Sequence, residues 1–165
     1  MHSLIDILPI EYIIIYMNYL LVSQISKKWN ISNWFKVGDY KKLPNEVGGK
    51  ETTKHKIVSK EIKKLIDWYN SLSLITFDDI LDFHYKFEMI HPFQDGNGRV
   101  GRLIMFKECL KHNIVPFIID DNLKLFYYRG LNEWKNEKGY LRDTCLTVQD
   151  KFKTWLDYFQ IPYKN

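Results

Sequence analysis

The chain has 165 residues, of which 45% are hydrophobic and 16% aromatic, so it is predicted to fold around a buried core and not to be disordered. Its net charge of +4 is compatible with anionic ligands such as nucleotides, and the absence of a long basic block argues against a nucleic-acid-binding arm. The two cysteines, Cys109 and Cys145, lie in no metal-binding or disulfide pattern, which favours reduced core thiols in a cytoplasmic protein.

The N-terminal region contains an apolar run, ILPIEYIIIYMNYLLV, at residues 7–22. Pro9, Glu11 and Asn18 interrupt this run, so it is a poor candidate for a membrane span, and the preceding MHSLID lacks the basic start of a signal peptide. We expect a buried or partner-facing helix within an N-terminal helical appendage, residues 1–33, which would be the remnant of a longer N-terminal region. Its apolar face leaves dimerisation open, and membrane attachment is the less favoured alternative.

Residues 36–50, KVGDYKKLPNEVGGK, carry most of the turn-forming residues outside the motif described below. Gly38, Pro44 and the Gly48–Gly49 pair break any helix there. Fifteen residues are long for a plain connector, so the segment is predicted to be a hairpin or an ordered loop.

Apolar positions at helical spacing predict five helices in the remainder of the chain. They cover residues 55–70, 76–91, 99–111, 123–134 and 141–159. Thr76 and Asp79 suggest a capped start, Pro92 an end near residue 91, and Asn113 a C-terminal stop. Residues 114–119, IVPFII, are an apolar connector. The apolar stripes are interpreted as core, and they include Leu110, Phe126, Trp155 and Phe159. The predicted fold is an all-α bundle with one small β-like excursion.

Residues 91–102 read HPFQDGNGRVGR and concentrate the polar chemistry of the chain. Gly96 and Gly98 flank Asn97, so this turn can adopt left-handed backbone geometry at little cost. Successive N–H groups in such a turn form a concavity for anions, and the start of the next helix adds its partial positive charge. The backbone alone therefore predicts an anion site.

Arg99 and Arg102 lie three residues apart on the first turn of that helix, and Gly101 between them leaves room for close approach. The alternative is a solvated basic face. Because basic residues at a helix N-terminus oppose the helix dipole, a bound polyphosphate explains both arginines better.

Asp95 and His91 supply the remaining chemistry of the motif. Asp95 can cap the helix, and it is also a hard oxygen ligand suited to Mg²⁺ beside phosphate oxygens. His91 has an ordinary pKa of about 6.5, which suits a general base near neutral pH. An isolated histidine is usually structural, but one this close to a phosphate nest favours catalysis.

The string HPFQDGNGRVGR closely resembles the Fic family signature HxFx(D/E)GNGRxxR, with every specified position filled. The resemblance covers about residues 34–160, and it includes the flap, GDYKKLPNEVGG, and the pair Tyr127–Tyr128. It implies a Fic domain over residues 34–165, a helical bundle with a short β-hairpin flap at 36–50 and a motif loop at 91–102.

The resemblance also implies an activity, the transfer of AMP from ATP to a Ser, Thr or Tyr hydroxyl of a target protein. Its catalytic base would be His91, and its Mg²⁺ ligand would be Asp95. The implied nucleotide-binding residues are Asp95, Gly96, Asn97, Gly98, Arg99, Gly101 and Arg102 in the motif, Val47, Gly48, Gly49 and Lys50 in the flap, and Tyr127. A target segment would pair with the flap. Lys135 stands where some relatives have an asparagine near the adenine.

Many Fic proteins carry an inhibitory helix, (S/T)xxxE(G/N), but none of the eight glutamates here is followed by Gly or Asn. The sequence therefore predicts that Arg102 is unblocked, with inhibition left to a separate antitoxin-like partner or to a longer form of the protein. Three alternatives remain: transfer of another group such as UMP, a catalytically silent Fic-scaffold interaction module, and a nucleic-acid binder. The intact motif argues against the second, and aromatics on apolar stripes argue against the third.

Overall fold

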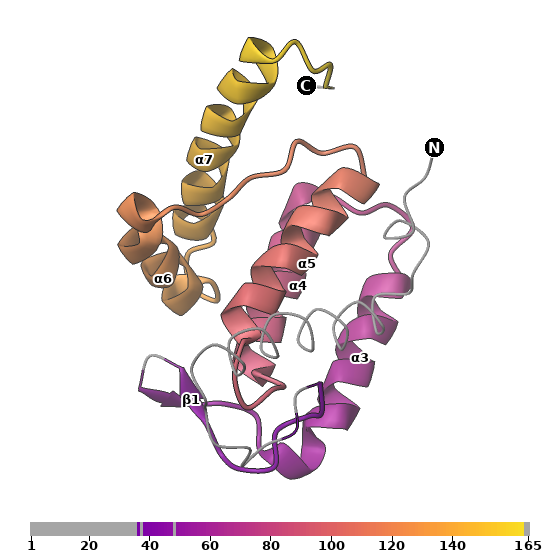
Figure 1. Cartoon of the computed structure of the whole chain (residues 1–165). Coiled ribbons are helices and arrows are strands. Elements are labelled where there is room, and N and C mark those ends of the chain that lie inside the picture. Colours follow the sequence, from indigo (N-terminus) through magenta and orange to yellow (C-terminus); the bar gives the residue numbers. More distant parts are fainter. Residues whose placement is uncertain (1–35, 37, 48, 164–165) are drawn as a thin grey trace. The chain divides into compact units, whose positions relative to one another are not determined.

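The computed structural model describes residues 36, 38–47 and 49–163, which form five α-helices and one two-stranded sheet (Figure 1). In chain order the elements are β1 (Glu46–Val47), β2 (Lys50–Glu51), the 3₁₀ turn η1 (His55–Ile57), α3 (Val58–Asn70), α4 (Phe77–Ile90), α5 (Asn97–Lys111), the 3₁₀ turn η2 (Asp121–Leu123), α6 (Lys124–Glu133) and α7 (Gly139–Tyr158). The predicted all-α fold with a short β-hairpin is confirmed. The expected appendage, residues 1–33, with its helix at 7–22, lies outside the described residues.

The hairpin forms at the end of the segment predicted to be a hairpin or ordered loop, residues 36–50, and extends one residue past it to Glu51. Its strands are antiparallel, with Glu46 opposite Glu51 and Val47 opposite Lys50. Gly49 has a φ of +75°, a left-handed conformation that glycine adopts without the cost of a Cβ. Gly48 lies outside the described residues.

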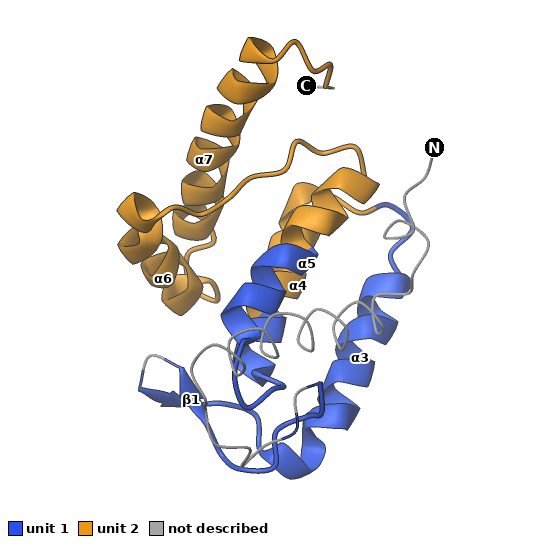
Figure 2. Ribbon diagram, in the orientation of Figure 1, with its two compact units in different colours: residues 1–74, 86–104 blue, residues 75–85, 105–165 orange. Residues whose placement is uncertain are grey.

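The chain divides into two compact units, shown in blue and orange in Figure 2. The first contains residues 86–104 and the chain up to Leu74, and the second contains residues 75–85 and 105–165. The boundary falls inside α4 and inside α5. The complete motif segment, residues 91–102, therefore belongs to the first unit.

In the first unit, α3 buries one face, as its periodicity predicts, and the end of α4, the motif loop and the start of α5 bury several large side chains. The buried residues of α3 are Val58, Ile62, Leu65, Ile66 and Tyr69. Those of the other segments are Phe87, Ile90, Phe93, Val100 and Ile104. The motif loop is thus anchored by apolar residues on both sides, and Phe93, which lies inside it, is only 1% exposed.

In the second unit, α6 packs closely against α7. A Cβ added at Gly130 of α6 would lie 2.5 Å from the Cα atom of Leu141, so only glycine permits this approach. The start of α4 is closed by the predicted cap, in which the Thr76 amide donates to Asp79 Oδ2 at 2.9 Å and the Asp79 amide donates to Thr76 Oγ1 at 3.2 Å.

Some apolar positions predicted to be core are exposed. Leu110 is 53% exposed, and the same correction applies to Phe126, Trp155 and Phe159. On α7 the buried positions end at Gln149, so the later turns carry an apolar stripe without becoming core. Periodicity finds the apolar face of a helix but not how far its neighbours cover it.

Cys109 and Cys145 are buried free thiols, as predicted. Burial raises the pKa of Cys109 to about 12 and that of Cys145 further, so both are unreactive at neutral pH. None of the helices in the described part of the chain is long and apolar enough to cross a membrane.

Candidate active site

The end of α4 presents His91. Its amide donates to the carbonyl of Phe87 at 2.9 Å, after which the backbone turns left-handed, with a φ of +51° at His91 itself. Histidine tolerates this conformation better than most residues, although it still carries some strain. Pro92 follows and prevents continuation of the helix, which is the boundary predicted from the sequence.

The imidazole of His91 is oriented by a backbone acceptor. Its Nδ1 lies 3.2 Å from the carbonyl oxygen of Glu88. Because a carbonyl only accepts, Nδ1 carries the proton of the neutral ring, and Nε2 is left with a free lone pair. The pKa of His91 is lowered first by burial and also by Lys41, against the bond to Glu88 and the charge of Asp95. The ring therefore favours its neutral form, which a general base requires.

The loop after His91 is closed by the side chain of Asn97. Its Oδ1 accepts from the Phe93 amide at 2.7 Å, and its Nδ2 donates to the Phe93 carbonyl at 2.8 Å. Asn97 is 2% exposed, so this side chain holds the loop and is not open to a ligand. Its expected part in phosphate binding can then come only from its backbone.

The anion nest predicted from the sequence involves two glycines that act differently. Gly96 is left-handed, with a φ of +85°, whereas Gly98 lies inside α5, which starts at Asn97 and not at residue 99. A Cβ at Gly98 would lie 3.1 Å from Arg102 Nη1, so the missing side chain makes room for that guanidinium. The first N–H groups of α5 have no acceptor within the helix and can face an anion.

The two arginines flank this helix start. Arg99 Nη2 lies 3.2 Å from Asp95 Oδ2, while Arg99 Nη1 is buried without a partner among the described residues. Asp95 also accepts from the Gly96 amide at 2.6 Å through Oδ1 and is half-exposed. An orphaned guanidinium donor beside free helix N–H groups fits a polyphosphate, which would supply the missing acceptor.

A metal would depend on Asp95 and the ligand together. The described residues contain no group of three or more His, Cys, Asp or Glu side chains that could bind a metal alone. One carboxylate with phosphate oxygens and water is nevertheless a usual arrangement for Mg²⁺. Asp95, at the mouth of the nest, fits that role.

Glu88, which the sequence analysis does not identify as a site residue, lies on α4 three residues before His91. It is 4% exposed, its Oε1 has no partner among the described residues, and its Oε2 is 3.9 Å from His91 Nδ1. Burial raises the pKa of Glu88 to about 7, against the attraction of Arg102. Its position three residues before His91 on a helix was the available signal, because such residues share a face.

The flap is joined to the motif loop by hydrogen bonds within the first unit. The Lys41 amide donates to the Pro92 carbonyl at 2.8 Å, and Asn45 Nδ2 donates to the Phe93 carbonyl at 2.9 Å. The hairpin that contains Val47, Gly49 and Lys50 begins directly after Asn45, so these two bonds link its base to the loop that follows His91. Their contacts with a nucleotide stay a prediction.

Tyr127 belongs to the second unit and is part of its core. It is 2% exposed, and its hydroxyl lies 2.6 Å from His84 Nε2. Its predicted role at the nucleotide stays a prediction. Gly101 is buried on α5, between the two arginines.

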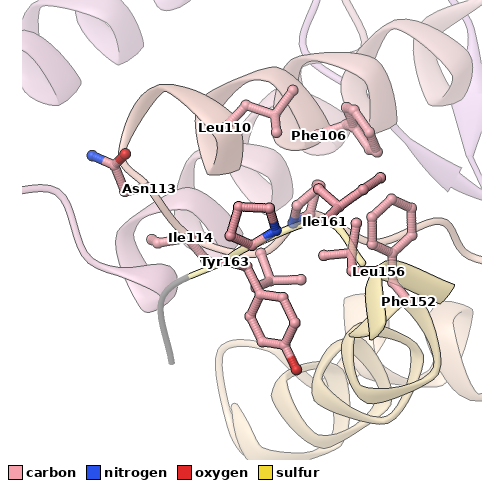
Figure 3. Close-up of a pocket in the computed structure, with 11 residues that line it drawn as sticks. Phe106, Leu110, Asn113, Ile114, Phe152, Leu156, Ile161 and Tyr163 are labelled. Atoms are coloured by element: carbon pink, nitrogen blue, oxygen red, sulfur yellow. The ribbon is translucent and has the colours of Figure 1, made fainter. Parts of the chain in front are cut away.

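A separate hollow of about 550 Å³ lies in the second unit and contains none of the motif residues (Figure 3). It is lined by the end of α5, the following turn, the last turns of α7 and the chain beyond α7. Figure 3 shows mostly apolar side chains around it, among them Phe106, Leu110, Phe152, Leu156 and Ile161. It offers no charged group for catalysis.

Comparisons with known proteins give one consistent family. A model described as the Fic/DOC family matches residues 9–109. Curated relatives include the protein adenylyltransferase fic-1 of Caenorhabditis elegans, 35% identical over 78 residues, and the protein adenylyltransferase Fic of Drosophila willistoni, 34% identical over 101 residues. These matches cover 46% and 59% of this chain, but only 15% and 20% of those relatives.

Solved structures share the fold. A Fic domain containing signaling protein from Bacteroides thetaiotaomicron is similar over 90% of this chain and 57% of that one, with a TM-score of 0.63 and 25% identity. Fic-1 from C. elegans is similar over 94% of this chain and 45% of that one, with a TM-score of 0.74 and 19% identity.

Proposed function

The chain belongs to the Fic/DOC family, and on that premise we propose that it is a protein adenylyltransferase, which transfers AMP from ATP to a hydroxyl side chain of a target protein. The observation that carries the proposal is a histidine whose Nδ1 is held by a backbone carbonyl, in the same short segment as a left-handed glycine, a helix start and the orphaned buried donor Arg99 Nη1. The names of the curated relatives favour ATP over other nucleotides.

In the proposed reaction, His91 Nε2 accepts the proton of the target hydroxyl. The hydroxyl oxygen then forms a bond to the α-phosphorus of ATP, and the bond from that phosphorus to the oxygen bridging to the β-phosphate breaks. AMP stays on the target, and pyrophosphate leaves. The histidine is expected to contribute about 10²–10⁴-fold to the rate.

The motif would bind the triphosphate through several groups at once. The N–H groups at the start of α5, Gly96 and the guanidinium of Arg99 would contact phosphate oxygens, and Arg102 would select the orientation that exposes the α-phosphorus. Asp95 would hold Mg²⁺, which neutralises charge on the phosphates and the leaving group. The flap, including Val47, would present the target segment by strand pairing.

The test is intact-protein and target-lysate mass spectrometry after incubation with ATP and Mg²⁺. We expect the wild type to add one AMP unit to itself or to a target, His91→Ala to add none, and the control His55→Ala to match the wild type. An equal gain in His91→Ala would exclude His91 as the base. If the target gains mass with UTP and not with ATP, the transferred group is UMP and not AMP.

Regulation and location remain part of the proposal. If Arg102 is unblocked, as the sequence predicts, activity would not need release from an inhibitory helix within this chain, and a separate antitoxin-like partner would supply the inhibition. Inhibition would instead lie within the same protein if a longer form of this chain carries a glutamate-bearing helix, and if the rate of AMP transfer rises when that helix is removed. A cytoplasmic location stays a prediction.

A further inference from the structure

Lys41 is a buried lysine at the base of the flap, with only 3% of its surface exposed. Its ammonium donates to three acceptors, Asn45 Oδ1 at 2.7 Å, Thr52 Oγ1 at 2.6 Å and the Ile90 carbonyl at 3.2 Å. All three acceptors are neutral, and no carboxylate within the described residues pairs with Lys41. An ammonium has three N–H groups, so none is left for a ligand.

The contacts of Lys41 lie on both sides of the proposed base. Its side chain bonds to the carbonyl of Ile90, the residue before His91, and its own amide donates to the carbonyl of Pro92, the residue after it, at 2.8 Å. A lysine about fifty positions earlier in the sequence therefore holds the backbone that carries the histidine. The same side chain holds Asn45 and Thr52, which flank the hairpin.

We propose that Lys41 is a positioning residue, which fixes His91 at the junction of flap and motif and acts on its imidazole through a buried positive charge. The catalytic role of His91 rests on the proposed function, but the effect of Lys41 on that ring does not. The three N–H groups of Lys41 are all occupied within the protein, so Lys41 is not assigned to bind the nucleotide or to act on the reacting atoms itself.

The charges around His91 oppose one another. The charge of Asp95 and the bond to the Glu88 carbonyl favour the protonated ring, while burial and the charge of Lys41 favour the neutral ring. The Glu88 carboxyl is 3.9 Å from Nδ1 and interacts in turn with Arg102. Lys41 itself has a pKa lowered to about 8 by burial, so it is mostly charged at neutral pH. Removing it should make His91 easier to protonate.

The direct test is NMR titration of the His91 imidazole in the full chain, with the resonance assigned by its loss in His91→Ala. In Lys41→Met we expect the pKa of His91 to move to higher pH. In Lys41→Arg, which keeps the charge, and in Lys60→Met, which removes an exposed lysine of α3, it should stay at the wild-type value. A folded Lys41→Met protein with an unchanged His91 titration would overturn the proposal.

A second comparison covers the case in which Lys41→Met does not fold. The wild-type His91 signal should show a small second step near pH 8, where Lys41 loses its proton, and Lys41→Arg should lack that step because a guanidinium stays charged. The two curves should agree through the titration of His91 itself, and they should differ only in this later step. Curves that also superimpose over the whole pH range in which a lysine loses its proton would reject the electrostatic coupling. Neither comparison depends on AMP transfer, so a failure of the proposed function would be seen separately.

Discussion

The side chain of Asn97 holds the motif loop through two hydrogen bonds to Phe93, so truncating it should reduce stability measurably. In Asn97→Ala the buried Phe93 amide loses its acceptor, while the Phe93 carbonyl keeps the donor Asn45 Nδ2 at 2.9 Å. An orphaned buried donor costs about 1–3 kcal/mol, and the second lost bond adds about 1 kcal/mol, so the expected loss is roughly 2–4 kcal/mol in the free energy of unfolding.

Urea unfolding followed by tryptophan fluorescence measures this loss. The matched control is Asn136→Ala, because Asn136 is exposed and its side chain makes a single hydrogen bond, a long one of 3.4 Å to Glu133, among the described residues. The control should stay within about 0.5 kcal/mol of the wild type. If the free energy of unfolding of Asn97→Ala falls no further than that of the control, Asn97 does not hold the loop. Its side chain would then be available as a phosphate ligand instead.

Three further changes have expected outcomes. Gly98→Ala should place a methyl group against the guanidinium of Arg102. We expect ATP binding, measured by calorimetry, to weaken about tenfold, which is equivalent to one disturbed charge-assisted hydrogen bond. The stability of the protein should be unchanged or higher. Gly130→Ala should lose about 1–3 kcal/mol in thermal or urea unfolding, because the methyl group meets the Leu141 backbone; full stability would mean that α6 and α7 can separate freely. In Glu88→Gln, where the neighbouring carboxyl cannot titrate, the rate of AMP transfer should fall on acidification only below the ordinary pKa of histidine, since the pKa of His91 is lowered; a higher midpoint in the pH–rate profile of that variant would contradict this.

The sequence predicted the parts of the site that depend on local geometry. The helix end at Ile90 follows from Pro92, and the left-handed turn at Gly96 follows from the absence of a Cβ. The start of α5 was placed two residues late, because the Gly98 position was assigned to the turn. Its actual role, making room for Arg102, depends on a side chain four residues further along the helix.

The parts that were missed depend on burial and on distant contacts. Lys41 looks like any flap lysine until the fold brings Asn45, Thr52 and Ile90 around it. Tyr127 was assigned to a nucleotide from resemblance alone, and nothing in its local sequence indicated the buried bond to His84. The bonds from Lys41 to Ile90 and from His84 to Tyr127 join residues 49 and 43 positions apart, which periodicity and motif spacing do not encode.

Glu88 offers a case in which stability and activity should respond in opposite directions. Burial raises the pKa of its carboxyl to about 7 in the folded protein, from about 4.5 when unfolded. The folded state therefore binds the proton more tightly, and the wild type should lose stability as the pH rises from about 4.5 to 7. At 1.36 kcal/mol for each pH unit, that loss amounts to about 3 kcal/mol.

Glu88→Gln keeps the shape of the protonated acid and removes the titration. Its free energy of unfolding should match the wild type near pH 4.5 and exceed it by up to about 3 kcal/mol above pH 7. The control Glu61→Gln, which changes a partly exposed glutamate paired with Lys64 on the surface of α3, should stay close to the wild type throughout. The same change removes a carboxylate 3.9 Å from His91 Nδ1, which would stabilise the imidazolium formed during proton transfer. A lower kcat in a more stable protein would show that the buried charge is kept for catalysis. Equal stability of Glu88→Gln and the wild type at both pH values would instead mean that the pKa of Glu88 is the same in the folded and unfolded states, against the expected rise.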